Sequence, residues 1–198
     1  MNHFLRLTVL ALLAAQLAGC AAMVVGGAVA TGVAVHDRRS VGTVIDDNVL
    51  QVRVRNALYV DDRFNQGARI KVNAFNGWVL LAGEVPSEDL VELATQRVAE
   101  VDGVLRLFNE LAAVERASLG EASNDRWISS RVNAGFTRIR NLPGFDPTRV
   151  QVTTARGVVY LQGLVSQAEA EAVTERARTV RGVERVVTMF EIRENAGS

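Results

Sequence analysis

Side chains that could act as nucleophiles, acid–base catalysts or metal ligands are scarce in this sequence of 198 residues. It holds one cysteine, Cys20, and only one histidine, His36, after the first 19 residues. Nucleophilic catalysis normally needs His, Cys or a perturbed Lys beside its partner, and a zinc site needs His or Cys ligands. The carboxylate pairs 46–47, 61–62 and 88–89 fall at expected helix ends, where capping and the helix dipole explain them. We therefore expect no enzyme activity, no catalytic residue, no metal site and no cofactor.

The cysteine stands where a lipid could be attached. Residues 1–6 carry a basic side chain and the free amine, residues 7–18 are almost wholly apolar, and the run ends in Leu-Ala-Gly-Cys at Cys20. This order is typical of a secretory signal peptide, residues 1–19. The tetrapeptide resembles the bacterial lipobox, which implies that Cys20 is acylated, for example with palmitate, and that residues 20–40 form a lipidated tether. The alternative is an ordinary cleaved signal followed by a chance cysteine.

A tryptophan flanked by arginines could bind anionic lipid. Trp127 lies in the first turn of an expected helix, and arginines follow along that helix and its exit. Tryptophan favours the headgroup region of a bilayer, and arginine can bind phosphate with two hydrogen bonds. The predicted phospholipid-binding residues are Arg126, Trp127, Ile128, Arg131, Arg138 and Arg140. The alternative is that Trp127 packs against its own core or against the preceding domain.

Charge is distributed unevenly along the chain. The whole sequence is balanced at 22 basic and 22 acidic residues, which gives no polyanion-binding signature, so we expect no nucleic-acid partner. Residues 41–120 hold 8 basic and 12 acidic side chains, whereas residues 121–198 hold 11 and 9. The second half is therefore the better partner for an anion, although a solvated surface of salt bridges explains the charges equally well.

The elements that carry these residues repeat along the chain. An apolar stripe at Leu50, Val54 and Leu58 predicts a helix that starts near residues 46–48, and Asn76-Gly77 predicts a tight hairpin between the strands 69–75 and 78–82. A second helix and a third strand, 104–111, follow. The same plan recurs at offsets of 78–80 residues, with a helix capped at Asn124 or Asp125.

These patterns predict an α/β fold of two tandem two-layer sandwiches. Each is expected to read αββαβ, with two helices on one face of a three-stranded mixed sheet. The expected domains are residues 41–114 and 124–193, joined by a linker at 115–123.

The residues of both units resemble the BON domain family. Asn76–Gly83, Asp102-Gly103-Val104 and Asn109-Glu110-Leu111 carry the resemblance in the first unit, and residues 156–163 and 181–190 carry it in the second. Two such domains behind a lipobox are similar to the dual-BON-domain lipoproteins of Gram-negative bacteria. That resemblance implies a lipoprotein on the periplasmic face of the outer membrane that supports envelope integrity. Ala21 after the cysteine, in place of Asp, implies the same location.

The resemblance also implies phospholipid binding, which agrees with the stretch around Trp127. We therefore expect the second domain to bind anionic phospholipids such as phosphatidylglycerol and cardiolipin. The alternative is a periplasmic adaptor or scaffold that binds another envelope protein through its sheet edges or helix faces.

Overall fold

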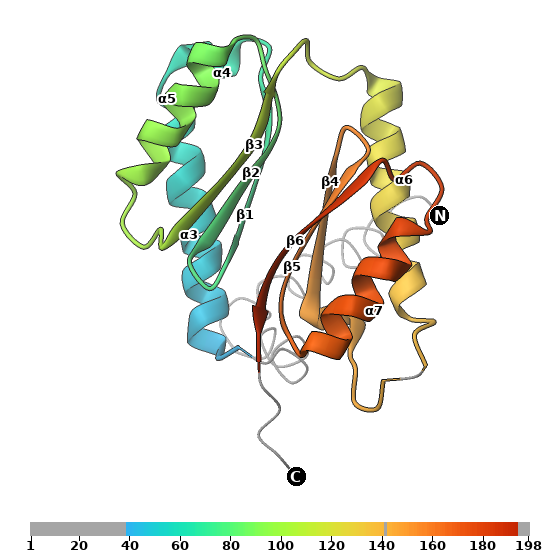
Figure 1. Ribbon diagram of the computed structural model, residues 1–198. Coiled ribbons are helices and arrows are strands. Elements are labelled where there is room, and N and C mark those ends of the chain that lie inside the picture. Colours follow the sequence, from blue (N-terminus) through green and yellow to red (C-terminus); the bar gives the residue numbers. More distant parts are fainter. Residues whose placement is uncertain (1–38, 141, 194–198) are drawn as a thin grey trace, which may run out of the picture. The chain divides into compact units, whose positions relative to one another are not determined.

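Two similar halves follow one another in the computed structural model, which describes residues 39–140 and 142–193 (Figure 1). The first half comprises α3 (Val41–Tyr59), α4 (Asp62–Asn65), β1 (Arg69–Phe75), β2 (Trp78–Val85), α5 (Glu88–Ala99) and β3 (Arg106–Ala113). The second comprises α6 (Leu119–Phe136), the 3-10 turn η1 (Pro147–Arg149), β4 (Val150–Ala155), β5 (Val158–Val165), α7 (Gln167–Arg178) and β6 (Arg185–Ile192). The predicted fold class is confirmed, and the short elements α4 and η1 are additions to it.

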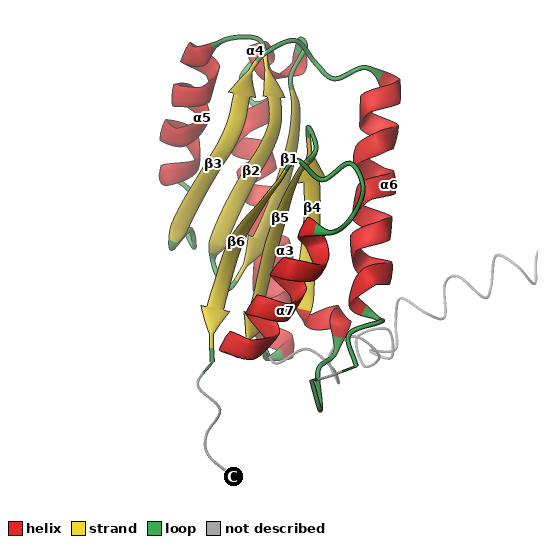
Figure 2. Ribbon diagram, turned by 45° about the vertical axis from the view of Figure 1, so that its right-hand side comes forward, coloured by secondary structure: helices red, strands yellow, loops and turns green. Residues whose placement is uncertain are grey.

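Each half builds a three-stranded mixed sheet with its second strand in the middle. β2 pairs antiparallel with β1 and parallel with β3, and β5 does the same with β4 and β6. The helices of each half lie on one face of its sheet (Figure 2). The parallel pair requires the helical crossover that the sequence pattern predicts.

The hairpin turns take the backbone conformation that the sequence signal indicates. Asn76 and Gly77 have φ values of +48° and +74°, and Arg156 and Gly157 have +53° and +72°. Two consecutive positive φ angles match the twist of the flanking strands, so the turn closes with two residues. The two halves therefore share their turn geometry although Arg replaces Asn in the second.

The predicted apolar stripes form the cores between helices and sheets. The side chains of Leu50, Val54 and Leu58 on α3 are at most 4% exposed, and Ile128, Val132 and Phe136 on α6 are fully buried. The first stripe packs in one cluster with residues such as Leu81, and the second packs with Leu161 and its neighbours. The spacing of four residues thus predicts the buried helix faces correctly.

The predicted starts of the first helix in each half are wrong. α3 begins after Ser40, whose side chain accepts a hydrogen bond from the Thr43 amide, and α6 begins after Ser118 in a capping box with Glu121. Both helices therefore extend one to two turns before the expected caps, and α6 occupies part of the expected linker. The carboxylates expected at these caps lie inside the helices, where Asp47 and Asp125 are buried.

The sheet faces that carry no helices form a third apolar cluster. Leu80 and Ala82 alternate along β2 with residues of the first core, so their side chains point to the opposite face. They share a cluster with Tyr160 of β5 and Met189 of β6. The two halves thus contact each other sheet to sheet, and burial of this surface stabilises their association.

Within residues 39–140 and 142–193, no helix is both long and apolar enough to cross a membrane. Cys20, the predicted signal peptide and most of the predicted tether lie outside the described residues.

Candidate functional site

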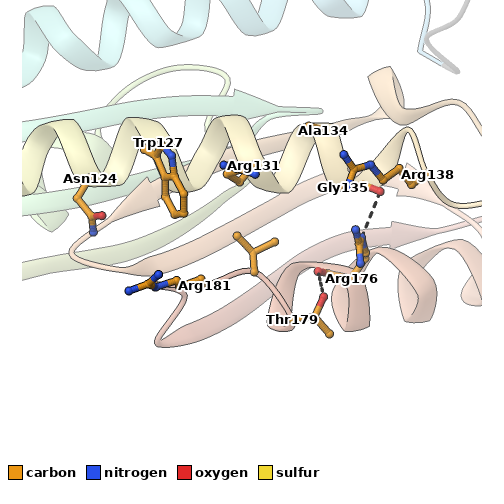
Figure 3. A pocket seen from close by; sticks show the side chains of 11 residues that line it. Asn124, Trp127, Arg131, Ala134, Gly135, Arg138, Arg176, Thr179 and Arg181 are labelled. Carbon is orange, nitrogen blue, oxygen red and sulfur yellow. Dashed lines mark hydrogen bonds between the residues drawn. The ribbon is translucent and has the colours of Figure 1, made fainter.

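A groove between α6 and α7 contains three of the predicted site residues (Figure 3). Trp127, Arg131 and Arg138 line it from α6 and its exit, and Arg176 and Arg181 line it from α7 and the turn that follows. The groove encloses about 610 Å³ and is open to solvent on one side. It therefore brings one aromatic ring and four guanidinium groups to one surface.

Trp127 presents its ring at the edge of this groove. The residue is 41% exposed, and the guanidinium carbon of Arg131, one turn further along α6, lies 4.9 Å from the ring centroid. A cation at this distance is attracted to the face of the indole ring, which limits the orientations of both side chains. Trp127 thus offers an apolar surface next to a positive charge.

Gly135 makes room for the arginine of the facing helix. The Arg176 Nε donates a hydrogen bond of 3.4 Å to the Gly135 carbonyl. A Cβ at position 135 would lie 3.1 Å from that Nε and 3.3 Å from the Arg176 Cγ, closer than most Cβ contacts. The absence of a side chain at Gly135 therefore allows Arg176 to lie against α6.

The four arginines of the groove have no carboxylate partner in the part of the chain that the structure describes. No salt bridge there involves Arg131, Arg138, Arg176 or Arg181. Other arginines are paired, such as Arg69 with Glu84 at 3.7 Å and Arg97 with Asp61 at 3.8 Å. The groove is thus a local concentration of uncompensated positive charge, which attracts anions.

The other predicted site residues do not belong to the groove. Ile128 is fully buried in the second core, so its inclusion as a lipid contact is wrong: its side chain is part of the apolar stripe of α6. Arg126 and Arg140 are exposed but do not line the groove. Arg126 lies near Lys71 of the first half, and its charge contributes to a lowered Lys71 pKa, whose main cause is burial.

The sequence pattern missed Arg176 and Arg181. Both belong to the second helix of the second half and the turn after it, where the spacing of apolar residues such as Val173 and Ala177 indicates only a buried helix face. Arg176 could have been found from the expectation that both helices lie on one face of the sheet. Adjacent helices on one face turn neighbouring sides towards each other, so residues of both share a surface. On that basis, arginines of α7 are expected to face the same groove as the arginines of α6.

The first half has a groove over part of the equivalent surface, lined by α3 and the turns at Gly77 and Gly103 and by no residue of α5. Val49 and Arg53 of α3 line it, at the positions equivalent to Trp127 and Arg131, and Asp102 stands where the second half has Arg181. Asp46 also lines this first groove, in place of Asn124. The same fold therefore supports an acidic groove without tryptophan in one half and a basic groove with tryptophan in the other.

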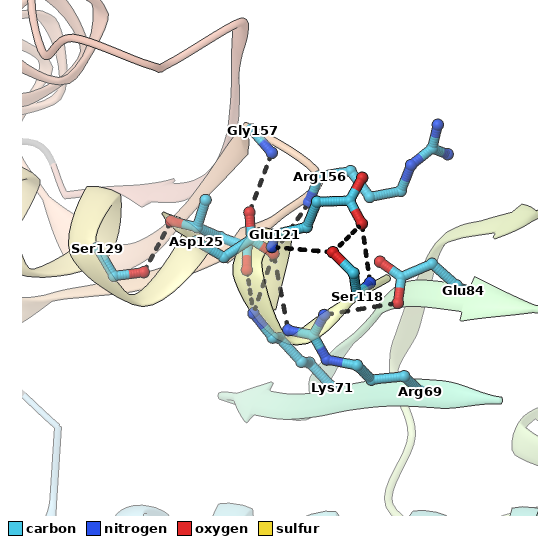
Figure 4. A network of polar contacts seen from close by, with 10 residues as sticks. Arg69, Lys71, Glu84, Ser118, Glu121, Asp125, Ser129, Arg156 and Gly157 are labelled. Carbon is cyan, nitrogen blue, oxygen red and sulfur yellow. Dashed lines mark hydrogen bonds and ion pairs between the residues drawn. The ribbon is translucent and has the colours of Figure 1, made fainter. Parts of the chain in front are cut away.

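A buried carboxylate joins α6 to both halves (Figure 4). The Asp125 oxygens accept hydrogen bonds from the backbone amides of Arg156 and Gly157 at 3.2 and 3.1 Å. They also lie 3.7 Å from Arg69 Nη2 and 3.8 Å from Lys71 Nζ, both on β1 of the first half. The helix that carries Trp127 is thus fixed to its own hairpin and to the first half.

No group of three or more His, Cys, Asp and Glu side chains that could hold a metal ion occurs in the described ranges. The expectation of a site without metal stays a prediction for the whole chain.

The family profile of the BON domain matches residues 46–115 and again residues 124–194. The chain belongs to the BON domain family. It is 33% identical over 174 residues to the outer membrane lipoprotein DolP of Haemophilus influenzae, covering 88% of this chain and 89% of the relative. It is 38% identical over 154 residues to a 21 kDa hemolysin of Actinobacillus pleuropneumoniae, covering 78% of each chain. The osmotically-inducible protein Y of Escherichia coli is 29% identical over 149 residues, covering 74% of this chain and 72% of the relative.

Proposed function

We propose that this BON-domain chain is a lipoprotein of the outer membrane that binds anionic phospholipid through the α6/α7 groove of its second half. The observation that carries this proposal is the exposed Trp127 ring beside four arginines without carboxylate partners in the described residues. Each basic residue near an anionic membrane surface contributes on the order of 1 kcal/mol, and tryptophan partitions to the headgroup level. The groove offers both contributions on one surface.

The membrane anchor in this proposal is a lipid on Cys20. It is supported by the signal-like segment before that cysteine and by the likeness to the outer membrane lipoprotein DolP across most of the chain. The anchor places the protein at the membrane permanently, on its periplasmic face, whereas the groove makes a second contact that depends on lipid charge. The role is binding rather than catalysis, and envelope integrity is the process it serves.

Vesicle sedimentation tests the lipid contact. A soluble fragment of residues 37–198 retains both cores, the sheet contact and the groove, because all of these lie within residues 39–193. We expect it to sediment with vesicles of phosphatidylcholine and phosphatidylglycerol, and not with phosphatidylcholine alone. Binding should weaken as salt rises, since the charges at the surface are screened.

The variant Trp127→Glu removes the apolar ring and adds a negative charge to the groove. We expect it to lose at least about tenfold in vesicle affinity, with unchanged circular dichroism. Leu119→Glu is the matched control, because Leu119 is 92% exposed on the same helix and does not line the groove. Equal binding by Trp127→Glu and the wild type would refute the groove as the lipid contact. A fragment that ignores anionic vesicles but retains a stoichiometric envelope protein would favour the adaptor function instead.

A further inference from the structure

The guanidinium group of Arg176 has a defined position in the groove. The Arg176 Nε donates a hydrogen bond to the Gly135 carbonyl. The Arg176 backbone carbonyl accepts a hydrogen bond of 2.8 Å from the Thr179 hydroxyl. The side chain is partly buried, in contrast to the exposed Arg178 two residues further along α7. The two terminal nitrogens of Arg176 remain for a ligand, in the planar geometry that matches two phosphate oxygens.

Arg131 and Arg138 line the same groove as this guanidinium group. Figure 3 shows Arg138 and Arg176 at the same end of the groove, beside Gly135, with Arg131 between this end and Trp127. Arg131 is restrained by its contact with the indole ring. Less conformational freedom is lost on binding when the donors are already in place, so the contacts of Arg176 and Arg131 favour a specific ligand over a diffuse anionic surface.

The first half acts as an internal comparison. Ala57 occupies the position equivalent to Gly135, and Arg97 occupies the position equivalent to Arg176. Arg97 does not line the groove of its half but lies 3.8 Å from Asp61. The glycine and the groove-facing arginine thus occur together in the second half, and both features are absent from the first.

We infer that Arg176, positioned by Gly135, forms with Arg131 and Arg138 a discrete phosphate subsite, which recognises one phosphate ester group. This inference rests on the proposed function and deepens it. A phosphate ester can come from a phospholipid headgroup or from a soluble ester such as glycerol 3-phosphate. Arg176 contacts the phosphate directly, and Gly135 is a positioning residue.

Charge-matched variants separate a discrete subsite from diffuse attraction. Arg176→Gln and Arg178→Gln each remove one positive charge from α7, but Arg178 faces solvent and lies 3.8 Å from Glu175. For the 37–198 fragment and phosphatidylglycerol vesicles, the subsite predicts an affinity loss on the order of tenfold for Arg176→Gln and less than about threefold for Arg178→Gln. It also predicts a loss for Arg176→Lys, which keeps the charge but lacks the fork.

The variant Gly135→Ala tests positioning without any change of charge. Its added methyl group should displace Arg176 and weaken vesicle binding, whereas diffuse attraction predicts no effect. In the Arg176→Gln background the same substitution should have no further effect on binding, because nothing remains to be positioned. A merely structural role of Gly135 would instead weaken binding equally in both backgrounds.

Soluble glycerol 3-phosphate separates the two phosphate sources. The subsite predicts that it displaces the fragment from vesicles more strongly than sodium chloride does at equal ionic strength, and that Arg176→Gln removes this difference. Binding of glycerol 3-phosphate by a wild type that ignores vesicles would support the subsite while refuting the lipid function. If the wild type binds vesicles and Arg176→Gln and Arg178→Gln lose equal vesicle affinity, the subsite is refuted and the lipid function stands.

Discussion

Asp47 and Asp125 occupy equivalent positions in the two halves, and each carboxylate holds the hairpin of its own sheet. The Asp47 oxygens accept hydrogen bonds from the amides of Asn76 and Gly77 at 2.8 and 2.9 Å. The cation beside Asp47 is Arg39, from the segment before its own helix, whereas Asp125 pairs with cations of the other half. The repeated carboxylate is thus compensated within the first half but across the halves in the second.

The variant Asp125→Ala should be strongly destabilising. It leaves the part-buried amide of Arg156 and the buried amide of Gly157 without this acceptor and removes the anion beside Arg69 and Lys71. We expect the free energy of unfolding to fall by about 3 kcal/mol, measured by urea denaturation. Glu175→Ala removes a carboxylate whose side chain is 71% exposed and should change stability by less than about 0.5 kcal/mol. Similar small effects of both variants would contradict the role of Asp125.

The partners of these two carboxylates cannot be predicted from the local sequence, for a physical reason. Acidic residues just before an apolar stripe are typical helix caps. A buried acid inside the first turns of a helix has the same local sequence, and only the donor that its carboxylate binds distinguishes it from a cap. That partner is a hairpin amide about 30 positions away, so no local pattern indicates it. The pairs at Asp61-Asp62 and Glu88-Asp89 do lie at helix ends. The partners of Asp61 and Asp89 from other elements are arginine side chains rather than hairpin amides.

The two sheets are the elements through which the halves contact each other. Tyr160 of β5 is 3% exposed within this contact, and its hydroxyl donates a hydrogen bond of 3.5 Å to Glu110 of β3. Burial raises the pKa of Tyr160 to about 12, and the Glu110 carboxylate adds to the rise. The folded protein therefore keeps this proton to a higher pH than the unfolded chain, in which a tyrosine titrates near pH 10.

Alkaline pH should weaken this sheet contact. Because the folded-state pKa of Tyr160 is the higher one, its contribution to stability is complete below about pH 10 and is lost as the pH rises towards 12. We expect the free energy of unfolding, measured by urea denaturation, to fall over this range in the wild type and to fall less steeply in Tyr160→Phe. An unchanged slope in Tyr160→Phe would contradict the role of this hydroxyl.

At the scale of elements, local chemistry predicts most of the fold. Strand 69–75 has the predicted bounds because Asn-Gly fixes the hairpin register. The predicted strand 78–82 is too short, since β2 continues through Gly83 to Val85. A Cβ at Gly83 would lie 2.0 Å from the Arg69 carbonyl oxygen, so this glycine permits close pairing rather than ending the strand. The contact of Arg176 on α7 with Gly135 on α6 depends on how the two helices pack. The residue pattern of one helix does not contain this information.

At the scale of the molecule, duplication has produced two grooves of opposite character. The first contains Asp46, Val49 and Asp102, and the second contains Trp127 with four arginines. An anionic membrane would repel the acidic groove and attract the basic one. The proposed lipid contact therefore belongs to the second half alone, while the first half supplies the cations that lie beside Asp125 of α6.

The most direct test of this assignment uses the two tryptophans as reporters. Trp78 packs against Phe108 in the first half with ring centroids 5.7 Å apart, and Trp127 lies at the basic groove. In the 37–198 fragment, Trp78→Phe leaves Trp127 as the only tryptophan, and Trp127→Phe leaves Trp78. We expect phosphatidylglycerol vesicles to shift the Trp127 emission to the blue and brominated lipid to quench it, with no change for Trp78. An unchanged Trp127 emission on vesicles that bind the protein, or a shift of Trp78 instead, would contradict lipid binding by the second half.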